Sequence, residues 1–171
     1  QKAVMPQPGS YRASVKSIGD PADIEKLADI LTKAERPAVL LGQQVWSSRG
    51  HEEAIEFVRA LDIPAYMNGA SRGLLPQSDP HHFDRTRSDA FKNADVILIV
   101  GTPFDFRMGY GKRISKEATL VQVDQSYATV GKNRDISLGL AGDPGAILAA
   151  VSQALTGRID NGARQQRQKW M

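Results

Sequence analysis

The loop after residues 96–100 carries residue types suited to binding an anionic ligand. Residues 96–100 are an unbroken apolar run, which is typical of a strand buried on both faces of a parallel sheet. Gly101 ends the run, and Asp105 and Arg107 follow it. A guanidinium can bind a phosphate through two parallel hydrogen bonds, which makes Arg107 a candidate phosphate ligand. A salt bridge from Arg107 to Asp105 is the alternative. Ligands bind beyond the carboxyl ends of such strands, so this loop is the first candidate site.

Small or acidic residues also follow the other apolar runs that we interpret as strands. Glycine lets a ligand approach the backbone closely, although a tight turn between a strand and a helix needs glycine too. Asp124 can accept a bond from a ribose hydroxyl or cap a turn, and both interpretations stay open. Arg72 and Arg113 are weaker candidates for a phosphate. The predicted strands 38–41, 63–67, 96–100, 119–123 and 136–140 are followed by Gly42, Asn68, Gly101, Asp124 and Gly142. This recurrence favours a nucleotide crevice at one edge of the sheet.

Helices are predicted between the strands. A first helix begins at Asp20-Pro21, because aspartate caps a helix and proline suits its first position. The last one begins in the same way at Asp143-Pro144 and extends to Leu155. Two more are predicted over residues 50–61 and 87–93. Strands and helices alternate in this order, which predicts a doubly wound, mostly parallel α/β sheet with helices on both faces.

Several familiar motifs are absent from the sequence. The pair Gly109-Tyr-Gly111 is not completed by a glycine at Ile114, so the dinucleotide fingerprint fails, and no phosphate-binding glycine-lysine loop occurs. No serine, histidine and acid stand in a recognisable catalytic arrangement. The pair His81-His82 lacks further ligands at metal-binding spacing, so we expect a solvent-exposed pair and no metal site.

The composition is that of one globular domain. The chain has 171 residues, no cysteine and a formal net charge of +3. No apolar run reaches membrane-spanning length, and the missing cysteine is typical of a cytoplasmic protein. The charge excess lies in the last segment, where Arg158, Arg164, Arg167 and Lys169 outnumber Asp160. No basic stripe crosses the rest of the chain, so we expect neither nucleic-acid nor membrane binding.

Both ends of the chain differ from its middle. Residues 1–19 are polar and rich in proline, glycine and serine, and they are interpreted as a linker. Residues 157–171 are polar, basic and irregular, and they are interpreted as a second linker or tail. The compact segment 20–156 between them has the character of a domain from a longer protein.

The chain resembles the central domain of thiamine-diphosphate-dependent enzymes, in the branch of acetolactate synthase and 2-hydroxyacyl-CoA lyase. The resemblance covers roughly residues 20–155, with the matching pieces in the family's order. These pieces are Arg36-Pro-Ala-Val-Leu-Leu-Gly42, Asn68-Gly-Ala-Ser-Arg-Gly-Leu-Leu-Pro76, Gly101-Thr-Pro-Phe-Asp-Phe-Arg-Met-Gly-Tyr-Gly111, Val121-Gln-Val-Asp124, Val130-Gly-Lys-Asn133 and Gly142-Asp143.

The resemblance implies a Rossmann-like three-layer fold of the DHS-like NAD/FAD-binding type. It also implies flanking pyrimidine-binding and diphosphate-binding domains in the same chain, and a homodimeric or homotetrameric parent. Thiamine diphosphate and magnesium are bound by those outer domains, which also supply the activating glutamate and the magnesium motif. Gly142-Asp143 is followed by Pro144 and does not form that motif. We therefore expect no catalytic residue and no metal ligand in this chain.

Relatives of this kind hold FAD, the ADP part of coenzyme A, or nothing in the central domain. Ser126 and Thr129 stand where FAD-binding members carry acids, so FAD, another ADP-containing nucleotide and an empty site all remain open. The candidate cofactor-binding residues are Gly42, Gln43, Asn68, Gly101, Thr102, Asp105, Arg107, Asp124 and Asp143.

The functional prediction is the structural, nucleotide-competent middle domain of an acetolactate-synthase-like enzyme. The parent is expected to act on 2-oxo acid or 2-hydroxyacyl substrates by forming or cleaving a carbon–carbon bond. The alternative is a stand-alone nucleotide-binding or sensing module without catalysis.

Overall fold

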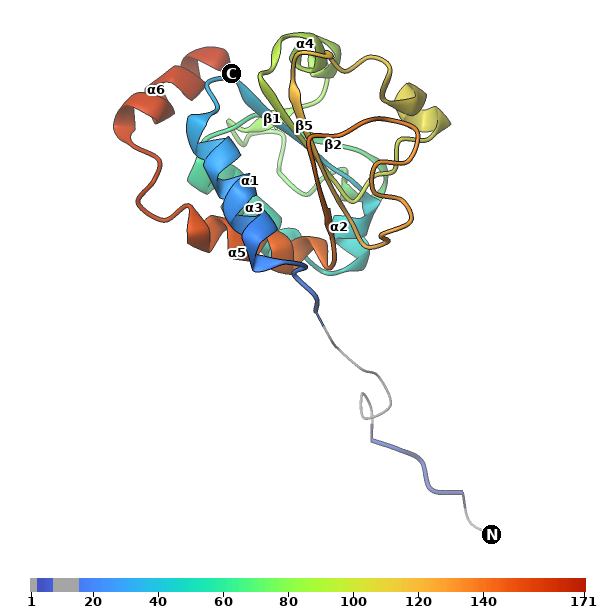
Figure 1. The fold of residues 1–171 in the computed structure, drawn as a ribbon. Helices are drawn as coiled ribbons and strands as arrows, with labels where there is room; N and C mark the ends of the chain where they lie inside the picture. The colour runs from blue at the N-terminus through green and yellow to red at the C-terminus, as the bar shows by residue number, and fades with distance from the viewer. Residues whose placement is uncertain (1–2, 8–15) are drawn as a thin grey trace.

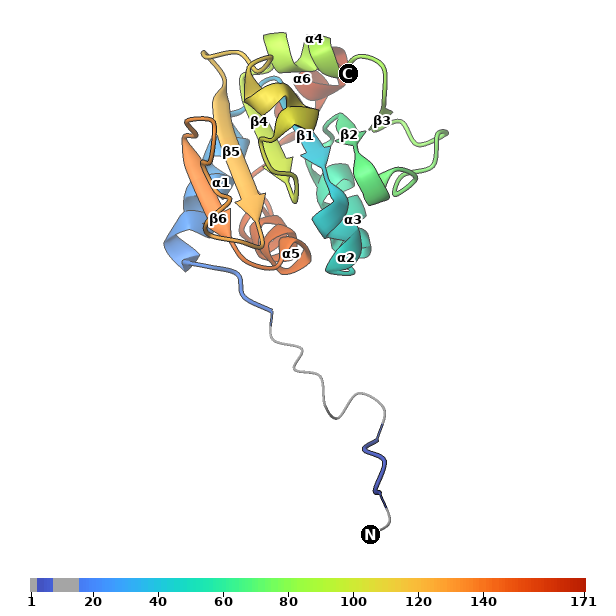
Figure 2. The ribbon, with the colours of Figure 1, turned by 90° about the vertical axis from the view of Figure 1, so that its right-hand side faces the viewer.

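A single parallel sheet forms the centre of the domain. The structure is a computed structural model that describes residues 3–7 and 16–171. The sheet has six strands in the order β3-β2-β1-β4-β5-β6, and every neighbouring pair is parallel. Figure 2 shows this order across the sheet. The strands are β1 (Pro37–Leu41), β2 (Ala65–Met67), β3 (His82–Phe83), β4 (Val96–Val100), β5 (Thr119–Asp124) and β6 (Leu138–Ala141). The predicted doubly wound sheet is confirmed, and its direction of winding reverses between β1 and β4.

The two central strands are buried on both faces. All five residues of β1 and all five of β4 are buried, which explains why both sequences lack polar alternation. Val39 and Leu41 point into the core on one face, whereas Ala38 and Leu40 point into a second core on the other. The sheet therefore lies between two cores, and with the elements that cover each of its faces it makes a three-layer fold.

The two faces of the sheet are covered differently. Three long helices pack on the first face, where α1 contacts α5 and α5 contacts α3. Figure 1 shows these helices together on one side of the sheet. The second face is covered by a shorter helix and a 3₁₀ segment, α4 and η2. The helices are α1 (Pro21–Lys33), α2 (Gln43–Ser47), α3 (His51–Leu61), η1 (Gly69–Ser71), α4 (Arg87–Asn93), η2 (Phe106–Gly111), α5 (Pro144–Ala154) and α6 (Asn161–Trp170).

The predicted helix starts have the expected caps. The Asp20 carboxylate accepts a hydrogen bond from the Ala22 amide at 2.8 Å, and Asp143 accepts one from the Ala146 amide at 2.8 Å. Two short elements, α2 and β3, were not predicted. They have five and two residues, too few to produce a periodic pattern.

The end of the chain is a helix, so the expectation of an irregular segment at 157–171 was wrong. Asp160 caps α6 by accepting from the Ala163 amide at 2.7 Å. The helix has almost no apolar face, which is why its sequence resembles a polar tail. Whether the segment also serves as a linker in a longer chain stays a prediction.

A buried arginine attaches α6 to the domain. Arg167 is completely buried, and its guanidinium donates to the carbonyl oxygens of Leu31 (2.5 Å), Ala34 (3.3 Å) and Leu61 (2.8 Å). These carbonyls end α1 and α3 and have no partner within their own helices. Trp170 adds a bond from its indole nitrogen to the Pro37 carbonyl at 3.0 Å. Directional hydrogen bonds therefore hold α6 where apolar packing is scarce.

His81 is buried, which corrects the expected solvent-exposed histidine pair. Its Nδ1 lies 3.0 Å from Asp79 Oδ1 and its Nε2 lies 2.8 Å from Asp62 Oδ1. Asp62 ends α3 in a left-handed conformation and also accepts a bond from Gln168 of α6 at 2.7 Å. Arg59 donates to Asp79 through Nε at 3.2 Å and Nη2 at 2.7 Å. This cluster joins α3, the segment before β3 and α6.

One end of the described fold lies at the carboxyl ends of the strands, and the other lies at their amino ends. The Ser17 carbonyl accepts from the Asp143 amide at 2.8 Å, beyond the carboxyl end of β6. Trp170 contacts Pro37, the first residue of β1. Figure 1 shows the N-terminal segment leaving from one end of the domain and the C-terminus at the other. The linker expected at 1–19 lies partly outside the described residues, and residues 3–7 and 16–20 form no helix or strand. Among the described residues, no helix has the length and hydrophobicity that crossing a bilayer requires.

Replacing Arg167 with methionine should destabilise the fold. Methionine keeps the apolar stem but leaves up to three buried carbonyl groups without a donor, so we expect a loss of about 2–4 kcal/mol in the free energy of unfolding. Urea unfolding followed by circular dichroism measures it. The control is Lys169→Met, which removes an exposed cation from the same helix and should change the value by less than about 0.5 kcal/mol. Equal losses in both variants would contradict the role of Arg167.

Acid should destabilise the domain through Asp79. Burial acts to raise the pKa of Asp79, but hydrogen bonds from Arg59 and His81 outweigh it and lower the pKa from 3.8 to about 2. A depressed pKa contributes stability above the unfolded value and loses it as the pH falls, so about 2 kcal/mol should disappear between pH 4 and pH 2. Asp79→Asn should reduce the pH dependence of the unfolding free energy in this range. An unchanged slope would show that other carboxylates cause the acid sensitivity.

Candidate functional site

The chain segments that follow β1 and β4 interlock at the carboxyl edge of the sheet. The Gly42 amide donates to the Val100 carbonyl at 2.7 Å, and the Gln44 amide donates to the Gly101 carbonyl at 3.3 Å. The segment after β1 enters α2, whereas the segment after β4 leads to η2 on the other face. This is the position between two diverging connections at which open α/β sheets place their ligands.

Glycine is required at both positions because protein atoms fill the space beside them. A Cβ on Gly42 would overlap with Thr102 Oγ1 and the Gly101 carbonyl. Gly101 has φ +67°, and a Cβ there would lie 2.7 Å from Gln44 Cβ. The two glycines therefore allow the loops to pack on each other, and a role in giving a ligand room stays a prediction.

Polar side chains tie the same edge to the segment after β2. Thr102 Oγ1 donates to Asn68 Oδ1 at 3.0 Å, and Ser71 Oγ donates to the Gly42 carbonyl at 2.6 Å. Asn68 Nδ2 also contacts the Met108 sulfur at 3.8 Å. These bonds hold Asn68 and Thr102 side by side at the rim of a cavity.

A cavity of about 260 Å³ opens at this edge between the ends of β1, β2 and β4. Among the residues that the structure describes, three guanidinium groups and no carboxylate line it. The lining residues are Gln43, Asn68, Gly69, Arg72, Arg87, Thr102, Pro103 and Arg107. A ligand there would meet amide, hydroxyl and guanidinium groups, which suits an anion rather than an apolar molecule.

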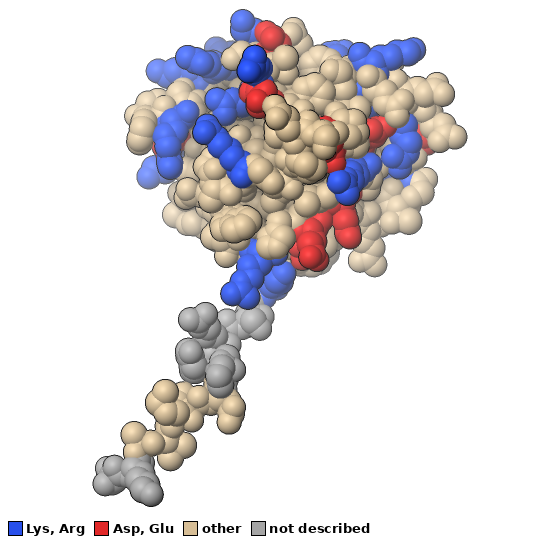
Figure 3. Space-filling view, turned by 180° about the vertical axis from the view of Figure 1, so that it is seen from behind, with Lys and Arg blue, Asp and Glu red and all other residues tan. Residues whose placement is uncertain are grey.

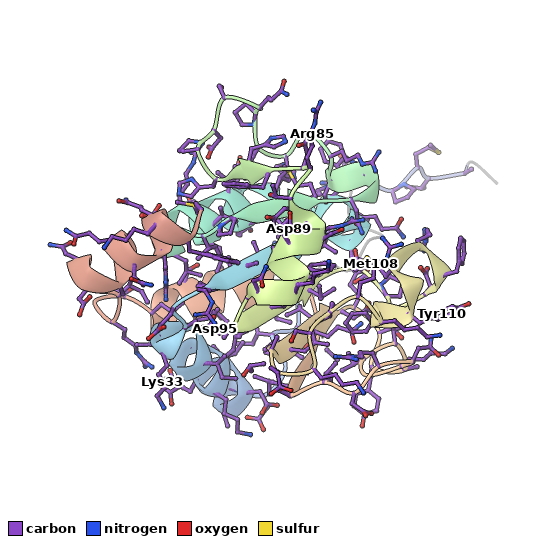
Figure 4. All side chains as sticks on the ribbon, turned by 90° about the horizontal axis from the view of Figure 1, so that it is seen from above. Lys33, Arg85, Asp89, Asp95, Met108 and Tyr110 are labelled. Carbon is purple, nitrogen blue, oxygen red and sulfur yellow. The ribbon has the colours of Figure 1, made fainter. Side chains whose placement is uncertain are left out.

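Two neighbouring cavities extend this site into an arginine groove, which we define by Arg72, Arg85, Arg87, Arg107 and Arg113. A cavity of about 430 Å³ shares Arg72 and Arg87 with the first, and one of about 150 Å³ shares Arg87 and Arg107. Within the described part of the chain, Asp84 is the only acidic residue that lines any of the three. Figure 4 shows Arg85 near one end of α4 and Met108 of η2 beside that helix. The view from behind shows basic side chains gathered on its left side with few acidic ones among them (Figure 3).

Most of these arginines have unused hydrogen-bonding capacity. The guanidinium groups of Arg72, Arg85 and Arg113 make no hydrogen bond or ion pair with any residue that the structure describes, and Arg87 only lies over the Phe91 ring at 5.9 Å. Like charges repel when they share a groove, and an anion that binds between them removes this repulsion. The groove is therefore suited to phosphate groups.

Arg107 is paired with Asp105, which is the alternative that the sequence left open. Arg107 Nε donates to Asp105 Oδ2 at 3.0 Å, and Nη2 donates to the same oxygen. Hydrogen bonds from Arg107 hold the pKa of Asp105 below its ordinary value, and Asp105 in turn raises the pKa of Arg107. Arg107 still lines the cavity and is more than half exposed. Asp105 thus orients the guanidinium and offsets its charge.

Asp124 is fully buried and serves as a turn cap. Its Oδ1 accepts from the Ser126 amide at 2.9 Å and from Gln44 Nε2 at 3.1 Å. Gln44 Oε1 accepts from the Gln125 amide at 2.9 Å. Asp124 Oδ2 is also buried, yet it has no hydrogen-bond partner. The Asp124 carboxylate therefore has no exposed surface, and one of its oxygens is bonded to Gln44.

Four of the nine predicted residues meet in the cavity: Gln43, Asn68, Thr102 and Arg107. The other five lie outside its lining, where Gly42 and Gly101 pack the loops, Asp105 holds Arg107, Asp124 caps a turn and Asp143 caps α5. Contact of any of the nine with a ligand stays a prediction. Sequence reasoning missed Arg85, Arg87 and Gln44. The first two flank a single residue before α4, and that spacing of two arginines near a strand end is a usable signal.

The described residues do not offer a ligand set for a magnesium ion. Within 3–7 and 16–171, no three His, Asp or Glu side chains are grouped to hold a metal ion. Asp143 is used as a helix cap.

The fold is that of a Rossmann-like domain, and the arginine groove lies at the carboxyl edge of its sheet. The family profile described as "Thiamine pyrophosphate enzyme, central domain" matches residues 24–151. The chain belongs to this family, as its resemblance predicted.

Curated relatives agree with this assignment, and a solved structure has the same fold. The chain is 32% identical over 139 residues to 2-hydroxyacyl-CoA lyase 2 of Danio rerio, covering 78% of the chain and 22% of the relative. It is 35% identical over 129 residues to acetolactate synthase large subunit IlvG of Mycobacterium tuberculosis, covering 75% and 24%. The structure of benzoylformate decarboxylase from Polynucleobacter necessarius matches its fold with a TM-score of 0.71 at 18% identity, over 91% of this chain and 31% of that one. The chain thus spans under a quarter of the length of these two curated relatives.

Replacing Gly101 with alanine should cost more stability than replacing Gly109. Both glycines have left-handed backbone angles, so each variant loses about 1–2 kcal/mol for the conformation. A Cβ at 109 meets nothing within 4 Å, whereas a Cβ at 101 overlaps with Gln44 and should cost about 1–3 kcal/mol more. Urea unfolding of the two variants measures the difference. Equal losses would show that the loops after β1 and β4 are not in tight contact.

Proposed function

We propose that this chain is the middle domain of an enzyme that uses thiamine diphosphate and magnesium. The parent would form or cleave a carbon–carbon bond beside the carbonyl of a 2-oxo acid or a 2-hydroxyacyl substrate. Membership of the central-domain family supports this proposal, as do the names of the relatives, which are an acetolactate synthase and a 2-hydroxyacyl-CoA lyase. Thiamine diphosphate supplies an electron sink for such chemistry when it is bound.

The flanking parts of the parent would carry out the reaction. Pyrimidine-binding and diphosphate-binding domains would precede and follow this chain, and the parent would assemble as a homodimer or homotetramer. The opposite placement of the two ends of the domain supports such a middle position. A cytoplasmic location is expected from the absence of cysteine, and no nucleic-acid or membrane partner is proposed.

The arginine groove would bind the diphosphate of an ADP-containing nucleotide, such as FAD or the ADP part of coenzyme A. The observation that carries this proposal is the set of unpaired guanidinium groups around Arg72 and Arg87 at the carboxyl edge. Guanidinium groups bind phosphate oxygens with paired, charge-assisted hydrogen bonds. Gln43 and Thr102 line the same cavity and can contribute further polar contacts.

Replacing Arg87 with alanine should weaken the binding of ADP and of pyrophosphate by about tenfold or more. The variant removes one charge-assisted contact to phosphate, which is worth about 1.5–3 kcal/mol. Isothermal titration calorimetry at low salt measures both ligands, and the affinity should fall as the salt concentration rises. Lys33→Ala is the control, because Lys33 ends α1 on the far side of the domain from Arg85 (Figure 4).

The comparison of the two variants also separates ligand binding in the groove from attraction of the ligand by the net charge of the chain. If Arg87→Ala and Lys33→Ala bind equally well, the net charge of the chain and not the groove attracts the ligand. If the unaltered chain binds neither ADP nor pyrophosphate, the nucleotide part of the proposed function is wrong, and the groove is structural.

A further inference from the structure

The Gln44 side chain is bonded to the end of β5 at Asp124. It lies across the end of β4, where only a glycine at position 101 leaves room for it. From there it donates to Asp124 Oδ1 at 3.1 Å and accepts from the Gln125 amide at 2.9 Å. Both ends of the Gln44 amide are therefore bonded, one of them to the carboxylate itself.

The carboxylate beneath Gln44 is an incomplete site. Asp124 has no exposed surface, and its Oδ2 has no donor although an ionised carboxyl group can accept about four hydrogen bonds. A buried acceptor without a donor is unfavourable, and a ligand hydroxyl that reached it would form a charge-assisted bond. An acceptor is thus present at the end of β5, and Gln44 is bonded to the other oxygen of the same carboxylate.

We propose that Gln44 is a specificity-determining residue that excludes ribose hydroxyls from Asp124. The ligand of the arginine groove is then recognised by its diphosphate, and the groove binds diphosphate esters with or without ribose hydroxyls equally well. The inference rests on the proposed binding of a diphosphate in this groove. It adds that the protein does not recognise the ribose of the ligand, because Gln44 blocks access to Asp124.

Removal of the Gln44 side chain tests this inference. Gln44→Ala keeps the Cβ that packs against Gly101 but removes both hydrogen bonds to the β5 end. ADP and 2′,3′-dideoxy-ADP differ only in the hydroxyls that Asp124 could accept from. In the unaltered chain the two dissociation constants should agree within about twofold. In Gln44→Ala, ADP should bind about tenfold more tightly than dideoxy-ADP, the effect of one hydrogen bond to a charged group.

Two further variants test whether the preference of Gln44→Ala for ADP over dideoxy-ADP comes from the Asp124 carboxylate. Gln125→Ala is the matched control, since it removes an exposed amide side chain but keeps the backbone N–H that bonds to Gln44. In this variant the ratio of the dissociation constants of dideoxy-ADP and ADP should stay near one. Adding Asp124→Ala to Gln44→Ala should bring the ratio back to one. Thermal unfolding of each variant shows that the chain is still folded.

The outcomes separate this inference from the proposed function. A tenfold preference for ADP in the unaltered chain, or a ratio near one in Gln44→Ala, would overturn the role of Gln44 while pyrophosphate binding still supports the groove. If pyrophosphate binds to no variant, the groove proposal fails instead. In that case NMR tests the placement of the Gln44 side chain over Asp124. The side-chain amide protons of Gln44 should show a nuclear Overhauser effect to the Gln125 amide proton. Its absence in the ligand-free chain would overturn this placement.

Discussion

The close packing of the chain after β1 on the chain after β4 is the constraint on which the candidate site depends. The two strands are neighbours in the sheet, but their connections lead to opposite faces, so their ends must pass each other without side chains between them. Glycine at 42 and 101 satisfies this requirement. The contact places Thr102 against Asn68 and lays Gln44 across the end of β4, so the cavity rim and the bonding of Gln44 to Asp124 follow from the same backbone geometry.

Arginine is used in two opposite ways in this domain. Arg167 is fully buried, and its guanidinium donates to carbonyls at the ends of α1 and α3, where the planar donor set matches several acceptors at once. Arg72 and Arg87 lie at the carboxyl edge and keep their donors unused by the described residues. The first use stabilises the fold, whereas the second leaves unsatisfied positive charge where a Rossmann-like sheet places its ligand.

The sequence predicted the regular parts of the fold because local rules determine them. The apolar run of β4 and the Asp143-Pro144 start of α5 were identified from a few adjacent residues. The α6 helix was not, since Arg167 replaces an apolar face and its acceptors lie more than 100 residues away in the sequence. The residues of the candidate site were predicted only where they follow a strand end directly. Strand ends indicated Asn68, Thr102 and Arg107, but the partnership of Gln44 with Asp124 is a long-range contact without a local pattern.

The residue two positions after Asp124 suits the proposed role of Gln44. This residue is Ser126, and its amide donates to Asp124 Oδ1. A carboxylate on that side chain would stand two residues from a buried one, and the repulsion between them would favour an open site that a ligand hydroxyl or water could enter. With serine there and an uncharged amide from Gln44 above, a single buried carboxylate can stay closed. The proposed diphosphate binding in the groove and the proposed role of Gln44 are therefore compatible, since together they would favour the diphosphate of a ligand over its sugar.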